Sequence, residues 1–307
     1  EPEVDGGAVQ YPSQLFRNAG DGIFHDVAPR AGVTNLRYCK GATWGDYDND
    51  DDPDLYVSNF GGRNRLYRNN GDGTFTDLAG ALGVGEPAAS FATWFWDYDN
   101  DGWLDIFVAG YGEDVADSAA DYLGIPNDGG RPRLYRNDGS GGFVDVTREM
   151  GLYRVHLAMG ANFGDLDNDG FPDFYLGTGF PSFDAVVPNV MYRNAGGRGF
   201  TDVTFSGGFG HLQKGHGIAF GDLDRDGDQD IYAQVGGFYP GDAFSNALYL
   251  NPGHGARWVS VRLVGVESNR AAIGARISVT VAAESGSRTV EAQVGSGGSF
   301  GASSLEQ

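Results

Sequence analysis

The chain has 307 residues and a formal net charge of −21 at pH 7. Such acidity argues against attraction to nucleic-acid phosphates or to an anionic lipid surface. Of the 42 acidic residues, 33 are Asp and 9 are Glu, and 51 residues are Gly. This composition favours turns and metal-binding loops over helices. No apolar run approaches the ~20 residues of a membrane-spanning helix, so we expect neither membrane insertion nor a nucleic-acid partner.

The first predicted element is a hairpin near the N-terminus. Its first strand carries Leu-Phe-Arg-Asn at residues 15–18, and Ile-Phe-His-Asp follows at 23–26 after a Gly-containing turn. Related Leu/Met-aromatic-Arg-Asn motifs recur at 66–69, 134–137 and 191–194, and a weaker copy lies at 248–251. Asn/Asp-Gly turns between short apolar runs are typical of β-hairpins.

A second motif, Asp-x-Asp-x-Asp-x-x-x-Asp, alternates with these hairpins. It occurs at residues 46–54, 97–105, 165–173 and 222–230, which we number loops 1 to 4. A short loop with carboxylates at positions 1, 3, 5 and 9 and a backbone carbonyl at position 7 can wrap one Ca²⁺. A solvated acidic turn is the plain alternative, but four copies with the same spacing favour about four calcium ions.

The predicted ligands occupy these five positions of each loop. They are Asp46, Asp48, Asp50, Asp52 and Asp54; Asp97, Asp99, Asp101, Trp103 and Asp105; Asp165, Asp167, Asp169, Phe171 and Asp173; and Asp222, Asp224, Asp226, Asp228 and Asp230. Position 6 is Gly in loops 2 to 4 and Asp51 in loop 1, and we expect a positive φ there.

An EF-hand would need a bidentate Glu at position 12 and flanking helices. Position 12 is instead apolar in every loop: Val57, Val108, Leu176 and Ala233. The residues after each loop are β-branched and aromatic, which favours strands. The loops are therefore predicted to join strand to strand.

One repeat unit thus reads strand, calcium loop, strand, connection, strand, tight turn, strand. Four-stranded units of this length are typical of β-propeller blades. We predict an all-β propeller with four full blades and an N-terminal half blade, in a ring of five positions. Small residues stand five positions before each loop, where inner strands would crowd the axis: Gly41, Ala92, Gly160 and Gly217.

These motifs resemble the FG-GAP or VCBS repeats that build calcium-bearing propeller blades in integrin α-subunits and many bacterial surface proteins. The resemblance covers about residues 12–255 and implies a propeller domain over 1–255. Residues 256–307, with Arg-Trp-Val-Ser-Val-Arg-Leu-Val-Gly at 257–265 and Ile-Gly-Ala-Arg at 273–276, look like the ASPIC/UnbV module of proteins similar to the cartilage acidic protein family. The family's usual His-x-Gly-Leu-Gly ending is missing, so we expect a truncated β module. Its strands, at 277–282 or 289–294, are expected to complete the half blade.

The face opposite the loops is expected to carry any ligand or partner site. Its long connections bear aromatic residues, which could bind a protein, stack on sugars or simply pack: Phe60, Tyr111, Tyr122, Phe180, Phe183, Phe238 and Tyr239. Four unlike residues precede the small residues and could ring the channel mouth: Lys40, Phe91, Met159 and His216.

No catalytic constellation stands out. His211 and His216 flank Lys214 but have no third ligand at zinc spacing, and no Gly-x-Ser-x-Gly elbow is present. We predict a secreted or cell-surface propeller, with the periplasm as an alternative location, that acts as a non-catalytic binding, adhesion or assembly module with a protein or glycan partner. The alternatives are a subunit of an extracellular filament or surface complex, and a carbohydrate-binding protein or enzyme using the irregular face.

Overall fold

The computed structural model describes residues 11–112, 114–183, 185–237, 239–255, 258–267, 269–283 and 286–295. Within these ranges the regular secondary structure is almost entirely antiparallel β-strand, with two short helices, α1 (Ala28–Ala31) and α2 (Val115–Tyr122). Helix α2 lies in the connection between the strands Asp105–Gly110 and Arg133–Asn137. None of the described helices is long and apolar enough to cross a bilayer. The predicted all-β propeller is confirmed.

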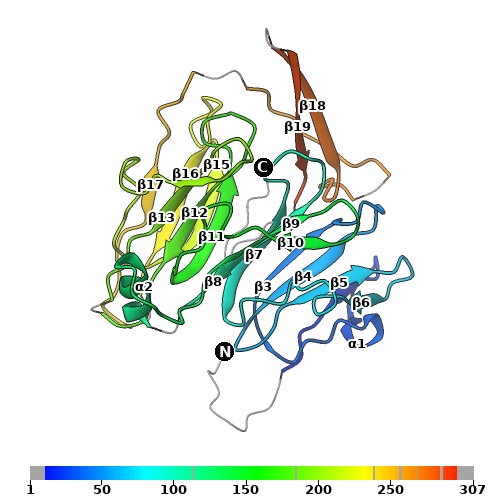
Figure 1. Ribbon diagram of the computed structural model, residues 1–307. Coiled ribbons are helices and arrows are strands. Elements are labelled where there is room, and N and C mark those ends of the chain that lie inside the picture. The colour runs from blue at the N-terminus through cyan, green and yellow to red at the C-terminus, as the bar shows by residue number, and fades with distance from the viewer. Residues whose placement is uncertain are drawn as a thin grey trace.

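Four sheets follow one another as blades (Figure 1). Blade 1 comprises β3 (Tyr38–Gly45), β4 (Asp54–Phe60), β5 (Arg65–Asn69) and β6 (Phe75–Asp77). Blade 2 comprises β7 (Ser90–Trp96), β8 (Asp105–Gly110), β9 (Arg133–Asn137) and β10 (Phe143–Asp145). Blade 3 comprises β11 (Ala158–Gly164), β12 (Asp173–Thr178), β13 (Val190–Asn194) and β14 (Phe200–Asp202). Blade 4 comprises β15 (Gly215–Gly221), β16 (Asp230–Val235) and β17 (Ala247–Tyr249).

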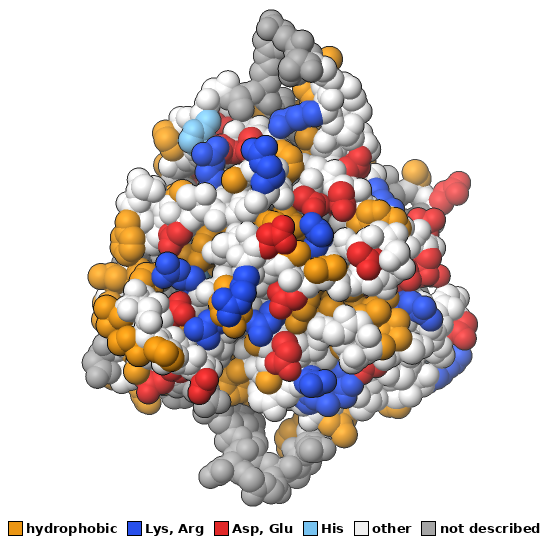
Figure 2. Space-filling model, in the orientation of Figure 1, with side chains coloured by type: hydrophobic (Ala, Val, Ile, Leu, Met, Phe, Trp, Pro, Cys, Tyr) orange, Lys and Arg blue, Asp and Glu red, His pale blue; other side chains and the backbone are white. Residues whose placement is uncertain are grey.

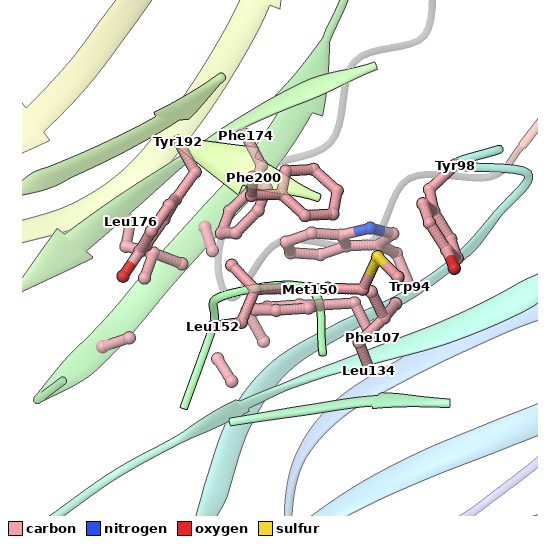
Figure 3. Packing of buried hydrophobic residues seen from close by; sticks show 14 of the residues in the cluster. Trp94, Tyr98, Phe107, Leu134, Met150, Leu152, Phe174, Leu176, Tyr192 and Phe200 are labelled. Atoms are coloured by element: carbon pink, nitrogen blue, oxygen red, sulfur yellow. The ribbon is translucent and has the colours of Figure 1, made fainter. Parts of the chain in front are cut away.

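The core lies between successive blades. Between blades 2 and 3, the ring of Phe107 in β8 packs against the ring of Phe174 in β12 with centroids 4.9 Å apart, inside one buried cluster (Figure 3). Separate buried clusters join blade 1 to blade 2 and blade 3 to blade 4. The aromatic residues of each repeat therefore fill the space between neighbouring blades, and no blade has a core of its own.

Of the two ends of this arrangement, only the C-terminal one differs from the predicted half blade and four full blades. The N-terminal half blade is present as β1 (Phe16–Asn18) paired with β2 (Phe24–Asp26), and α1 with the nearby Leu15 packs against blade 1. Blade 4, however, has three strands in the described part of the chain. Only a weak copy of the hairpin motif stands at β17, and the Phe-x-Asp strand of the other blades does not follow it.

The C-terminal strands exist, but the predicted pairing with the half blade is wrong. Strand β18 (Arg276–Ala283) pairs with β19 (Gly286–Gln293) in a separate two-stranded sheet. Two residues separate these strands in the sequence, so their pairing closes a much smaller loop than pairing with residues 16–26 would require. Figure 1 shows this hairpin beyond the blades, close to the turns between their strands.

The small residues near the axis allow close approach of neighbouring inner strands. A Cβ added to Gly160 would lie 1.1 Å from the carbonyl oxygen of His216 in blade 4, and one added to Gly41 would lie 2.8 Å from the carbonyl oxygen of Phe91 in blade 2. The sequence prediction of crowding at this position is confirmed for these two glycines.

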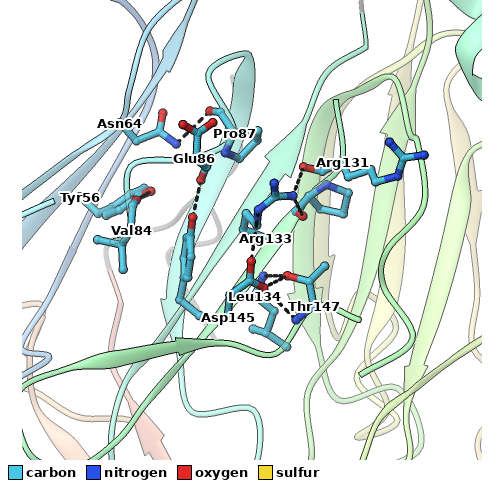
Figure 4. Close-up of polar contacts among 12 residues, drawn as sticks. Tyr56, Asn64, Val84, Glu86, Pro87, Arg131, Arg133, Leu134, Asp145 and Thr147 are labelled. Atoms are coloured by element: carbon cyan, nitrogen blue, oxygen red, sulfur yellow. Dashed lines mark hydrogen bonds and ion pairs between the residues drawn. The ribbon is translucent and has the colours of Figure 1, made fainter. Parts of the chain in front are cut away.

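Arginines at a fixed repeat position link the outer strands of a blade. Arg133 at the start of β9 pairs with Asp145 of β10, with Nε 3.3 Å from Oδ2, while Thr147 Oγ1 accepts the N–H of Leu134 (Figure 4). Arg65 pairs with Asp77 in the same way in blade 1. Figure 2 shows acidic and basic side chains interspersed over the visible face, in keeping with such local pairing.

Candidate metal centre

Each loop brings three Asp carboxylates together at the end of a blade. In each loop one oxygen from each of three carboxylates lies within 4.8 Å of the others. The triplets are Asp46, Asp48 and Asp50; Asp97, Asp99 and Asp101; Asp165, Asp167 and Asp173; and Asp222, Asp224 and Asp230. Two oxygens that share one Ca²⁺ at ~2.4 Å can be at most about 4.8 Å apart, so every triplet could hold one such ion.

The structure thus unites three of the four predicted carboxylates of each loop. The fourth, Asp54, Asp105, Asp169 or Asp226, lies in the same loop but outside the triplet. The residues predicted at position 7, Asp52, Trp103, Phe171 and Asp228, all donate their N–H to the position 5 carboxylate. In this Asx turn the N–H group of the position 7 residue makes the hydrogen bond, and its carbonyl group takes no part in it.

Position 1 anchors the curvature of the loop. In loop 2, Asp97 Oδ1 accepts the N–H of Asp101 at 3.0 Å, and Oδ2 accepts the N–H of Gly102 at 2.8 Å. The other three loops repeat both bonds. The expected positive φ at position 6 is confirmed, at 71° for Asp51 and 85° to 95° for the three glycines.

Position 9 has a structural role that spacing alone did not reveal. Both oxygens of Asp105 accept backbone N–H groups, from Tyr98 at 3.2 Å and from Asn137 at 2.8 Å. The position 9 residues of the other loops make the same two bonds. This carboxylate therefore joins the loop to the third strand of its own blade.

The position 3 carboxylates carry the strongest indication of a cation site. In loops 1 to 3 the Oδ1 atoms of Asp48, Asp99 and Asp167 are buried and have no hydrogen-bond partner. The other oxygen of Asp167, Oδ2, accepts from Arg193 Nε at 2.7 Å, which leaves Oδ1 as the oxygen without a donor. A buried carboxylate oxygen without a donor is costly unless a cation compensates it.

The electrostatics of the loops also fit a cation. Burial is the main cause that raises the pKa of Asp97 to about 7, of Asp165 to about 6 and of Asp173 to about 8. Backbone N–H groups oppose the rise, and neighbouring carboxylates add to it. Burial disfavours the charged form of a carboxylate. A bound divalent cation stabilises that charged form.

Comparison with known proteins identifies the repeat. The sequence matches the FG-GAP-like repeat over residues 7–57, 52–108 and 116–176, which is more than half of the chain. The chain belongs to the FG-GAP-like repeat family. The match spans the half blade, blades 1 and 2, and the first two strands of blade 3.

Relatives of this FG-GAP-like chain carry the name cartilage acidic protein 1. The Homo sapiens protein is 26% identical over 239 residues, which cover 70% of this chain and 36% of that protein. The Mus musculus protein is 25% identical over 238 residues, with the same coverage, and the Xenopus tropicalis protein is 32% identical over 100 residues, 31% of this chain and 15% of its own length. The chain therefore spans about a third of the mammalian relatives' length. None of these names denotes an enzyme.

The FG-GAP-like loops are also linked from blade to blade by asparagines, which the sequence reasoning missed. The Nδ2 of Asn137 donates to the carbonyl of Tyr47 in loop 1, at 2.8 Å, and Asn194 and Asn251 make the equivalent bond to loops 2 and 3. The recurrence of Asn at the end of each hairpin motif was the available signal.

A second set of asparagines, at loop position 4, reaches the following loop. Asn49 Nδ2 donates to the carbonyl of Gly102, Asn100 to that of Gly170 and Asn168 to that of Gly227. All three have a positive φ, between 53° and 60°. In loop 4, position 4 is Arg225. The loops thus form one hydrogen-bonded row rather than four independent turns.

On the opposite face, several of the predicted binding aromatics are packed. Phe60, Phe91, Tyr111, Met159 and Phe180 belong to one apolar cluster. Lys40 lies over the Tyr38 ring at 3.9 Å. Of the four predicted channel-mouth residues, Phe91 and Met159 are buried.

Three other predicted aromatics are accessible. Phe183 and Tyr239 are 61% and 46% exposed and stack with centroids 5.5 Å apart. Tyr122 is 47% exposed and lies beside Arg154. Phe238 lies outside the described residues.

The His and Lys residues singled out in the sequence do not form a further metal cluster. Lys214 is buried and pairs with Asp242, and burial lowers the pKa of His216. In the parts of the chain that the structure describes, only the four loops bring three His, Cys, Asp or Glu ligand atoms this close together.

Proposed function

We propose that this FG-GAP-like propeller is a calcium-stabilised, extracellular binding module without catalytic activity. The observation that carries the proposal is the triplet of carboxylate oxygens within 4.8 Å in every loop, with a buried position 3 oxygen that has no donor in loops 1 to 3. Oxygen-only ligands from short flexible loops are those that Ca²⁺ prefers.

The Asp residues at positions 1, 3, 5 and 9 are the proposed carboxylate ligands, and the position 7 carbonyls complete each set. When bound, the cation supplies positive charge that offsets the repulsion among these anions. Because the loops are joined in a row by Asn49, Asn100 and Asn168, we expect the stabilisation to extend over all four blades.

An extracellular location follows from the same chemistry. Extracellular modules of this kind bind calcium with dissociation constants of ~10⁻⁴–10⁻³ M, which extracellular calcium keeps filled. The name cartilage acidic protein 1 of the relatives supports the same location.

The binding surface that we propose is the face opposite the loops. Phe183 and Tyr239 form a stacked pair of large exposed rings. Lys214, which pairs with Asp242, lies over the Phe183 ring. Exposed aromatic rings serve as hot spots for protein partners and as platforms for sugars. A protein or glycan bound here should lose affinity on Phe183→Ala, whereas Phe24→Ala, an exposed Phe of the half blade, should leave binding unchanged. A glycan array and a pull-down with both variants test this.

Native mass spectrometry combined with a thermal melt tests the calcium proposal. We expect about four Ca²⁺ per chain and a melting temperature that rises with calcium and falls with chelator, since binding to the folded state alone stabilises it. Absence of bound calcium together with an unchanged melt would overturn the proposal.

A second candidate role, as a subunit of an extracellular assembly, rests on the edge of blade 4. Strand β17 has no fourth strand beside it among the described residues. Tyr232 and Leu248, cross-strand partners on β16 and β17, are 42% and 51% exposed. An open edge with apolar side chains can pair with a strand of another copy. Sedimentation or electron microscopy that shows only monomers with and without calcium would exclude this role.

A further inference from the structure

The C-terminal hairpin β18–β19 lies on the row of calcium loops. An isolated two-stranded hairpin is marginally stable in water. Here its two strands pair along their full length, from Arg276↔Gln293 to Ala283↔Gly286, and they pair with no other described strand. The persistence of the hairpin must therefore depend on what it contacts.

Those contacts reach three loops in succession. Arg276 donates to Asp46 Oδ2 of loop 1 at 2.5 Å, where the carboxylate is 6% exposed and the guanidinium 40%. The backbone N–H of Glu291 donates to Asn100 Oδ1 of loop 2 at 3.0 Å. Arg288 donates to the carbonyl of Asp169 in loop 3.

Apolar packing supplements these polar contacts. A Cβ added to Gly170, at position 6 of loop 3, would lie 2.8 Å from Val290 Cγ2. Loop 4 is covered by the segment that precedes the hairpin, because a Cβ added to Gly227 would lie 1.9 Å from Trp258 Nε1. The C-terminal segment from Trp258 onward therefore touches every loop of the row.

The atoms that the hairpin contacts belong to the curved part of each loop. Asn100 and Gly170 both hold a positive φ, at 58° and 85°, in the turn that wraps the carboxylate triplet. Loop 1 differs, because Arg276 lies on the Asp46 carboxylate itself and offsets part of its charge. In loops 2 and 3, three anions within 4.8 Å of one another repel without a cation, and the turn that presents Asn100 or Gly170 loses its support.

We propose that the row of loops is a calcium-dependent docking surface for the chain's own C-terminal hairpin. The hairpin lies across loops 1 to 3 while these loops hold their cations and is released when they empty. This inference rests on the proposed calcium binding. Docking of the hairpin and binding of the cations are thermodynamically linked, so each strengthens the other. The link arises because the contacts of the hairpin require the curved form of the loop.

Hydrogen exchange measured by mass spectrometry, together with metal counting on the same samples, tests the docking. The full chain is compared in calcium and in chelator, and peptides from 276–283 and 286–293 are followed beside core peptides of β8 and β12. We expect exchange in the hairpin to be roughly tenfold faster in chelator at a concentration where the core peptides remain protected.

Two loop variants provide a matched comparison at full calcium. Asp99→Asn removes one carboxylate from loop 2, to which Glu291 of the hairpin donates, and Asp224→Asn removes one from loop 4, with which the described residues of the hairpin form no hydrogen bond or ion pair. We expect each to lose one ion, but only Asp99→Asn to accelerate exchange in the hairpin. Equal acceleration by both, or by neither, would overturn the inference while the metal count still supports calcium binding. A metal count of zero in the unaltered chain would overturn both.

A variant outside the propeller avoids any change to the loops themselves. Arg276→Gln removes the ion pair with Asp46, and Arg262→Gln removes an exposed arginine of the same segment that forms no ion pair within the described ranges. We expect Arg276→Gln to speed exchange of the β18 amides roughly fivefold in calcium and Arg262→Gln to leave it unchanged. Unchanged exchange in Arg276→Gln would mean that the hairpin is held independently of loop 1.

Discussion

The Asn137 side-chain amide donates to the backbone carbonyl of Tyr47, 2.8 Å away, across the boundary between blades 1 and 2. The same Nδ2 donates to the carbonyl of Leu104, and Oδ1 accepts the N–H of Gly139. Asn137 is 2% exposed. One buried side chain therefore satisfies three backbone groups and joins loop 1 to loop 2.

Replacement of Asn137 by Ala should reduce stability by about 2–3 kcal/mol, because it leaves buried carbonyls without donors. The matched control is Asn69→Ala in blade 1. Asn69 donates to the carbonyl of Pro53 in its own blade at an exposed site, and no complete blade precedes it. We expect a loss of about 1 kcal/mol there. Urea denaturation of both variants in calcium measures the difference, and equal losses would contradict the role assigned to the bond between blades.

Replacement of Gly160 by Ala should be poorly tolerated. Its Cβ would lie 1.1 Å from a backbone carbonyl oxygen of the neighbouring inner strand, and a backbone atom cannot rotate away as a side chain can. We expect a loss of at least about 3 kcal/mol or a failure to fold.

Gly221→Ala is the control for this substitution, since nothing lies within 4 Å of the added Cβ. Its stability should change by no more than about 0.5 kcal/mol. Thermal melts of both variants compare them, and similar melting temperatures would show that the inner strands are less closely packed than described.

Two Asp→Asn variants of loop 2 should respond differently to calcium. Asp99 carries a buried oxygen without a donor, so Asp99→Asn relieves repulsion in chelator and should leave stability unchanged or higher there, while in calcium it should lower the melting temperature. Asp105 accepts two backbone N–H groups. Because an amide offers one oxygen where the carboxylate offers two, Asp105→Asn should cost about 2 kcal/mol in chelator and more in calcium, where it also weakens a proposed ligand. Parallel melts distinguish Asp99, whose loss matters in calcium alone, from Asp105, which also holds the loop to its blade.

His156 should make stability depend on mildly acidic pH. The ring is buried, its Nε2 lies 2.9 Å from Tyr192 Oη, and burial lowers its pKa from 6.5 to about 4. The unfolded chain therefore binds a proton below pH ~6.5 that the folded chain does not accept until about pH 4. The contribution is complete above pH ~6.5 and is lost progressively as the pH falls toward 4, by up to about 3 kcal/mol.

Burial also raises the pKa of Asp97 to about 7 and of Asp165 to about 6, so the effect of His156 is measured as a difference. The unfolding free energy of the unaltered chain and of His156→Gln is determined from pH 4 to pH 8 in saturating calcium. The unaltered chain should lose more stability on acidification than the variant does. Parallel curves would show that His156 is not kept neutral by the fold.

Local spacing was enough to predict the loops and the strands beside them. The ligand positions of an Asp loop lie within nine consecutive residues, so the turn at Gly102 and the carboxylate triplet around Asp99 follow from short-range geometry. The β-branched and aromatic residues of β8 and β12 likewise indicate a strand through neighbours in the chain. The family of the repeat was recognisable for the same reason.

Contacts between segments far apart in the chain were decided by the tertiary structure alone. The bond from Asn137 to Tyr47, the approach of Gly160 to His216 and the position of Arg276 on Asp46 join residues whose sequence separation carries no pattern. The expected pairing of the C-terminal strands with the half blade failed because β18 and β19, which are adjacent in the sequence, pair with each other at a lower loop-closure cost. The sequence by itself determined four acidic loops, their strands and the propeller repeat, because these depend on neighbours in the chain. Only the folded molecule decided how the loops are linked in a row and what lies across them, because these contacts depend on which surfaces the stacked blades bring together.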